Sequence, residues 1–153
     1  MLSENYNESS EEYYGKKGMS LLGFFLRWRV LDNGPIHVHY IDCISLNSKQ
    51  DGKQVQGIIQ LVMPKVRDIV PSATDVILLS DNGPAFISRE NTKVFWRLNK
   101  EGWGCGLRVT RWMFFESQCG KTPLDTHFSF VGILIRRYAR KVGAVKVHQD
   151  IYD

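Results

Sequence analysis

The chain has 153 residues, and its 43% hydrophobic and 12% aromatic content excludes a wholly disordered protein and favours one folded domain. The net charge is +4, but residues 1–18 hold four Glu and two Lys, which leaves +6 on residues 19–153. That basic body is compatible with a polyanionic partner. The three cysteines form no C-x-x-C pair, which argues against a zinc ribbon, a thioredoxin motif or a disulfide scaffold and favours an intracellular chain.

The polar, acidic residues 1–18 are predicted to be a flexible leader, because they resemble neither a signal peptide nor a transit peptide. Residues 19–145 are predicted to form the folded domain and residues 146–153 a tail. No apolar run reaches the roughly 18 residues that a membrane helix needs, so no membrane partner is expected.

The folded part begins with two strand-like runs. Residues 19–30 are rich in apolar and aromatic side chains, and Ile36–Ser45 alternates in polarity. Asn33 and Gly34 lie between the two runs, and Asn-Gly is a strong turn signal in that setting. The sequence therefore predicts an antiparallel hairpin.

A helix is predicted next, over residues 54–70, because apolar residues recur there at intervals of three and four. Asp51 or Ser48 is expected to cap its start. Pro64 lies inside the pattern and has no N–H to donate, so a kink or an early break is expected near Val62.

The remaining elements alternate between strands and helices. Asp75–Ser80 is a short apolar run that predicts a strand buried on both faces, as in a parallel sheet. A short helix is expected near residues 92–98, a strand over residues 107–115 and a long helix over residues 125–142. This order predicts a mixed α/β sheet.

The sharpest motif is SDNGPAF at residues 80–86, directly after that apolar strand. A carboxylate at the carboxyl end of a parallel strand lies in the crevice where open α/β sheets bind ligands. Asn82 and Gly83 allow a sharp turn behind it. Asp81 is therefore a candidate ligand for Mg²⁺, provided that other oxygen ligands converge on it. An ordinary Asp-Asn-Gly turn is the alternative.

SDNGPAF resembles the second-acid motif of retroviral integrases and DDE transposases. The resemblance implies an RNase H-like fold in which three acids hold two Mg²⁺ or Mn²⁺ ions for DNA strand cleavage and joining. YYGKKGMS and GKTPLDTHF are similar to segments of eukaryotic transposon-derived proteins, so the resemblance spans roughly residues 8–142, although Thr122 stands where that family has Gly. It also implies a DNA partner and a nuclear location.

The resemblance implies a third acid near the last helix, and two residues compete for that role. Asp125 lies in the first helical turn, three residues before Phe128, and is expected to share its core-facing side. It is the favoured metal ligand beside Asp81. Glu116, at the end of the preceding strand, is the other candidate catalytic acid. A helix-start carboxylate is the ordinary alternative for Asp125, and His127 is either a metal or phosphate ligand or a structural histidine.

The first acid of the family lies on a strand that precedes the hairpin. Asp42 is on the second arm of the hairpin instead, and residues 1–18 contain no strand-like run. The chain is therefore expected to lack the first strand and the first acid, and to be catalytically incomplete. The exposed sheet edge is expected to favour self-association. The alternative function is a transposon-derived module that binds nucleic acid or a protein without catalysis.

Two further groups of residues are candidates for contact with nucleic acid, and both have an ordinary structural alternative. One is a basic cluster near the end of the last helix, which is either a phosphate contact or a solvated face; it consists of Arg136, Arg137, Arg140 and Lys141. The other is a pair of tryptophans, either a base-stacking surface or cover for the sheet; it consists of Trp96 and Trp103, near Lys93, Arg97 and Lys100.

Overall fold

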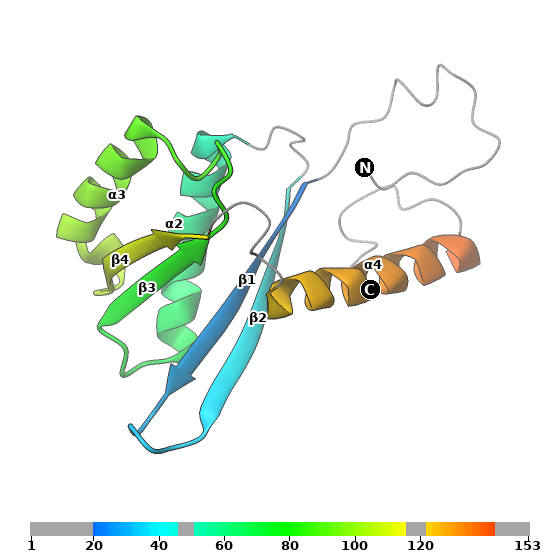
Figure 1. The fold of residues 1–153 in the computed structure, drawn as a ribbon, viewed down its shortest axis with the longest axis horizontal. Coiled ribbons are helices and arrows are strands. Elements are labelled where there is room, and N and C mark those ends of the chain that lie inside the picture. The colour runs from blue at the N-terminus through cyan, green and yellow to red at the C-terminus, as the bar shows by residue number, and fades with distance from the viewer. Residues whose placement is uncertain (1–19, 46–50, 116–121, 143–153) are drawn as a thin grey trace. The chain divides into compact units, whose positions relative to one another are not determined.

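The computed structural model describes residues 20–45, 51–115 and 122–142 (Figure 1). The chain divides into two compact units, Gln50–Lys121 and a second unit formed by Met1–Lys49 with Thr122–Asp153. The described ranges contain three α-helices and two two-stranded sheets, which confirms the predicted mixed α/β class. Within those ranges, no helix is both long and apolar enough to cross a bilayer.

The unit that contains both termini begins with the predicted hairpin. Strands β1 (Ser20–Arg29) and β2 (Ile36–Ser45) pair antiparallel over their full length, which confirms the hairpin. The N–H of Gly34 donates to the Leu31 carbonyl at 2.9 Å and closes the turn. Cross-strand aromatic contacts, such as the one between Phe25 and Tyr40 at 5.1 Å between ring centroids, add to the ladder.

Helix α4 (Pro123–Val142) packs on this hairpin and completes the unit. Its Phe128 ring lies against β1 at Gly23, where a Cβ atom would be 2.6 Å from the ring. A glycine at position 23 therefore allows the helix to approach the strand closely. The helix starts two residues earlier than residues 125–142 predicted, because Pro123 is well suited to the first helical position.

The other unit begins with helix α2 (Gly52–Ile69), and Asp51 is its N-cap, as predicted. The Asp51 side chain accepts a hydrogen bond from the N–H of Gln54 at 2.9 Å. Of the two outcomes expected near Val62, the early break is wrong, because the helix continues through Pro64 to Ile69, and the kink stays a prediction. Val62 and Met63 are both buried there, and tertiary packing of this kind outweighs the hydrogen bond that a proline removes.

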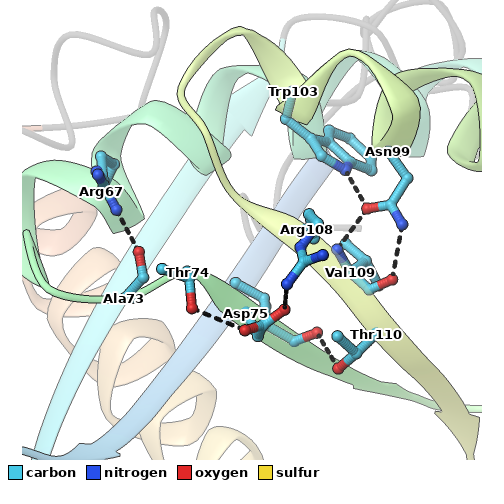
Figure 2. Close-up of polar contacts among 10 residues, drawn as sticks. Arg67, Ala73, Thr74, Asp75, Asn99, Trp103, Arg108, Val109 and Thr110 are labelled. Carbon is cyan, nitrogen blue, oxygen red and sulfur yellow. Dashed lines mark hydrogen bonds and ion pairs between the residues drawn. The ribbon is translucent and has the colours of Figure 1, made fainter.

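Strands β3 (Asp75–Ser80) and β4 (Arg108–Phe114) pair in parallel, with one irregularity in register after Val76. The prediction that β3 is buried on both faces is wrong, since Ile77 and Leu79 are 51% and 53% exposed. Alternate strand residues point to opposite faces, and only the face of Val76 and Leu78 is covered in part, since both are half-buried. At the start of the pair, Arg108 forms an exposed ion pair with Asp75 at 3.1 Å (Figure 2).

Helix α3 (Arg89–Lys100) is longer than residues 92–98 predicted, because Ser88 caps it by accepting from the N–H of Asn91 at 3.0 Å. Asn99 ties its last turn to β4, as Figure 2 shows. The Asn99 side chain accepts from the Val109 N–H at 2.5 Å and donates to the Val109 carbonyl at 3.1 Å. It also accepts from the Trp103 indole N–H at 3.3 Å.

Trp103 lies in the short 3₁₀ turn η1 (Gly102–Gly104) and belongs to an aromatic cluster of this unit. Its ring contacts that of Phe95, which in turn meets the edge of Trp112. Trp103 is only 6% exposed. Its φ of 56° lies in the left-handed region, which residues other than glycine rarely adopt. Burial and the Asn99 hydrogen bond hold the ring in that strained position.

Candidate functional site

Asp81 directly follows β3, at the end where the parallel strands finish. Two hydrogen bonds join that end to β4: the Phe115 N–H donates to the Ser80 carbonyl at 2.9 Å, and the Trp112 indole N–H donates to the Ser80 hydroxyl at 3.1 Å. The Asp81 side chain is exposed, and its Oδ1 accepts from the Gly83 N–H at 2.9 Å. This Asx turn orients an accessible carboxylate at the carboxyl end of a parallel pair.

The loop after Asp81 is held by one buried side chain, Asn91, which is 0% exposed. Its amide nitrogen donates to the carbonyls of Ala85 and Phe86 at 2.8 and 3.0 Å, and its amide oxygen accepts from the Gln56 side chain at 2.5 Å. Asn91 therefore joins α3, α2 and the Asp81 loop. Sequence reasoning missed it, because nothing in the sequence distinguishes this asparagine from an exposed helical residue.

Asp125 acts as a helix cap at the start of α4. Its Oδ2 accepts from the N–H and the hydroxyl of Thr122, at 2.6 and 3.1 Å. This is the capping contact that a carboxylate at the third helical position makes with the residue before the helix. Asp125 is exposed whereas Phe128 is half-buried, so the expectation that they share the core-facing side is wrong. The ordinary helix-start alternative fits these contacts.

The shared metal site of Asp81 and Asp125 stays a prediction. The two residues belong to different units, each of which is described by itself, and Glu116 lies outside the described residues. Carboxylate oxygens suit Mg²⁺ by donor type. Among the residues that the structure describes, however, no three His, Cys, Asp or Glu side chains come together. We therefore derive no catalytic step through a metal ion.

Asp42 and His127 form a pair that sequence reasoning did not connect. The His127 Nε2 lies 2.7 Å from Oδ2 of Asp42, where the ring N–H donates to the carboxylate. The imidazole also stacks on Tyr40, with ring centroids 4.2 Å apart. Both side chains are largely buried, at 19% and 26% exposure for His127 and Asp42. The partners are 85 residues apart, so only the packing of α4 on the hairpin reveals the pair.

The other carboxylate oxygen of Asp42, Oδ1, is buried and has no hydrogen-bond partner among the described residues. A buried carboxylate oxygen without a donor is costly. Burial, and to a smaller extent the Asp42 carboxylate, raise the pKa of the neighbouring Cys43 thiol above its ordinary value. The pair can orient an imidazole and hold a proton, but a raised pKa makes the adjacent thiol a poor nucleophile.

The candidate nucleic-acid contacts divide into exposed and buried residues. The four basic side chains near the end of α4 are all exposed, namely Arg136, Arg137, Arg140 and Lys141. The two tryptophans differ sharply. Trp103 is part of the core, which is the ordinary alternative, whereas Trp96 is 63% exposed on α3.

Comparisons with known proteins find no family model, no curated protein and no solved structure that matches the chain.

Proposed function

We propose that the chain is an RNase H-like domain related to DDE transposases and retroviral integrases, and that its 153 residues do not complete the catalytic site. The observation that carries the proposal is Asp81 at the carboxyl end of a parallel strand pair, within SDNGPAF. The element order supports it, because a hairpin, a helix, a strand, a helix, a strand and a helix follow one another as the resemblance implies.

Two observations support the incomplete site. In the family the first acid lies on a strand that precedes the hairpin, and the first strand among the described residues is β1, which is itself an arm of the hairpin. Asp42, the acid of the hairpin considered for this role, is on β2 and bonded to His127. A two-metal site without one bridging acid positions its ions poorly, so strand transfer by these residues is not expected.

The second candidate function is a DNA-binding module without catalysis, located in the nucleus. The capping contacts of Asp125 favour it, since they give this carboxylate a structural role. The exposed basic residues of α4, Arg136 to Lys141, would then contact phosphates. Both functions share DNA as the partner.

The deciding experiment combines metal binding and nicking. We expect that the chain with Mg²⁺ or Mn²⁺ leaves supercoiled DNA intact. Mn²⁺ binding, followed by electron paramagnetic resonance, is expected to weaken in Asp81→Asn and in Asp125→Asn alike, because the proposal gives them a shared site. Asn at position 125 retains an oxygen that can accept from Thr122.

Three results would bear against parts of the proposal. Unchanged Mn²⁺ binding in both variants would remove the shared site and leave the binding module. An effect of Asp81→Asn without one of Asp125→Asn would reject Asp125 as the third acid. Metal-dependent nicking that Asp81→Ala abolishes would show that the chain does complete a catalytic site.

A further inference from the structure

Trp96 is exposed because the core of its unit leaves no place for it. The buried side of α3 is formed by Asn91 and Phe95, which are 0% and 7% exposed. Successive helical residues are about 100° apart, so Trp96 points well away from Phe95. Tryptophan is on average a highly buried residue, and one that is 63% exposed on a rigid helix is unusual.

The side chains around Trp96 are cations. Four of them share the outer face of α3 with Trp96 at spacings of three and four residues, and all are exposed: Arg89, Lys93, Arg97 and Lys100. Glu90 is the one acid within the helix. Trp96 and all of these cations except Lys100 line an open hollow of about 610 Å³, together with Thr92. We call these five residues, Trp96 and the four cations, the α3 outer face.

We propose that the α3 outer face binds single-stranded DNA, with a base stacked on Trp96 and the backbone phosphates held by the four cations. The choice of DNA rests on the proposed function. The rest of the proposal stands on the exposed ring, the charge and the single rigid helix that carries both. Sequence-independent binding of single strands uses this combination of an aromatic platform with a basic groove.

The dimensions of the face suit a short stretch of a single strand. Arg89 and Lys100 are eleven residues apart, which is about 16 Å along a helix. Phosphates follow one another at about 3.4 Å along the axis of one strand in a duplex, and further apart when the strand is stretched, so about three to five nucleotides cover the face. Four cations along that length match the phosphates that the strand presents.

The exposed tryptophan favours a single strand over a duplex. A duplex offers its phosphates, but its bases are stacked on each other and give Trp96 no partner. In the free protein the Lys100 ammonium lies 3.8 Å from the centroid of the Trp96 ring. A phosphate beside Lys100 would attract the ammonium away from the Trp96 ring. The same strand would then provide a phosphate for Lys100 and a base for Trp96.

The test is a fluorescence-anisotropy titration of the full chain with three probes: labelled dT20, an abasic strand of equal length and a duplex of equal length. We expect dT20 to bind most tightly. Trp96→Ala is expected to weaken the binding of dT20 about 5- to 160-fold, as the loss of one stacked base implies, and to leave the binding of the abasic strand nearly unchanged. Trp28→Ala is the matched control, because Trp28 stacks on His37 in the hairpin, outside α3.

A pair of charge variants tests the phosphate contacts. Lys93→Gln with Arg97→Gln is expected to reduce the slope of log affinity against log salt by about 1.4, since each lost single-strand contact contributes about 0.7. Lys53→Gln with Lys65→Gln removes the same charge from exposed positions on α2 and is expected to change the slope much less.

The outcomes separate this proposal from the proposed function. If the chain binds dT20 but Trp96→Ala affects it no more than Trp28→Ala, or if the duplex binds as tightly as dT20, the α3 assignment is wrong while DNA binding stands. If none of the three probes binds, both proposals fail. Equal loss of the abasic strand and dT20 in Trp96→Ala would overturn base stacking.

Discussion

Asn91→Ala is expected to destabilise the protein far more than an average helical substitution. The amide of Asn91 makes three side-chain hydrogen bonds at a position with no solvent exposure: two to the carbonyls of Ala85 and Phe86 and one from Gln56. Alanine removes all three hydrogen bonds and leaves the two carbonyls and the Gln56 amide without the partner that Asn91 provides in the wild type.

The size of the effect follows from those contacts. A hydrogen bond contributes about 0.5–1.5 kcal/mol net, and a partner that is left buried and unsatisfied costs about 1–3 kcal/mol. Ala85, Phe86 and Gln56 are half-buried, so water reaches some of them in the variant. We expect a loss of about 2–4 kcal/mol in the free energy of unfolding, a large part of the roughly 5–15 kcal/mol that stabilises a domain.

Urea unfolding followed by tryptophan fluorescence measures this loss, because Trp103 and Trp112 lie in the same unit as Asn91. Gln60→Ala, on the exposed side of α2, is the control and is expected to change stability by less than about 0.5 kcal/mol. Asn91→Asp keeps the volume but turns two donors into acceptors, so it should lose at least as much as Asn91→Ala. If the free energy of unfolding of Asn91→Ala is within about 0.5 kcal/mol of the wild-type value, Asn91 does not hold the loop after Asp81.

Three further predictions concern the remaining described surfaces. His127→Phe keeps an aromatic ring against Tyr40 but removes the one hydrogen bond that the described residues make to the Asp42 carboxylate. Thermal denaturation should therefore show a loss of about 1–3 kcal/mol in the free energy of unfolding, and an unchanged midpoint would mean that the bond does not form. Because its pKa is raised, Cys43 should react with iodoacetamide at pH 8 more slowly than a peptide thiol, as measured by mass spectrometry, and equal rates would contradict its burial. Because the pKa of Cys43 is raised on folding, the stability that the protonated thiol contributes is fully present below the pKa of the unfolded thiol. It is lost as the pH rises through the higher pKa of the folded protein. Leu79 is exposed on the face of β3 opposite Val76 and Leu78 and should promote self-association. Sedimentation should therefore show less self-association in Leu79→Lys, and equal association would place the contact elsewhere.

The local elements could be predicted from the sequence because local rules determine them. The Asn-Gly turn, the period of α2 with its Asp51 cap and the apolar run of β3 each act over a few residues, and the structure contains each of these elements. The two errors in these elements both concern packing. Whether a helix tolerates Pro64, and whether both faces of β3 are covered, depends on neighbours that are distant in sequence.

The candidate site was less predictable for the same reason. Asp81 could be identified because a motif follows a strand directly, whereas the pairing of Asp42 with His127 depends on the docking of α4 against the hairpin. Asn91 is a further case, since its structural role comes from hydrogen bonds to three partners on two other segments, helix α2 and the loop after Asp81. The two tryptophans illustrate the limit most clearly: both lie among basic residues in the sequence, but only Trp96 is exposed.

Helix α3 connects the candidate acid with the proposed DNA surface through its two opposite sides. On the inner side, Asn91 fixes the loop that begins at Asp81. On the outer side, Trp96 and the four cations are exposed and do not form part of the core. Substitutions on the two sides should therefore separate. Asn91 variants change stability and the order of the Asp81 loop, whereas Trp96 variants change affinity for a single strand without unfolding the helix. That separation follows because one rigid helix contributes a buried hydrogen-bond network and an exposed binding surface with no side chain in common.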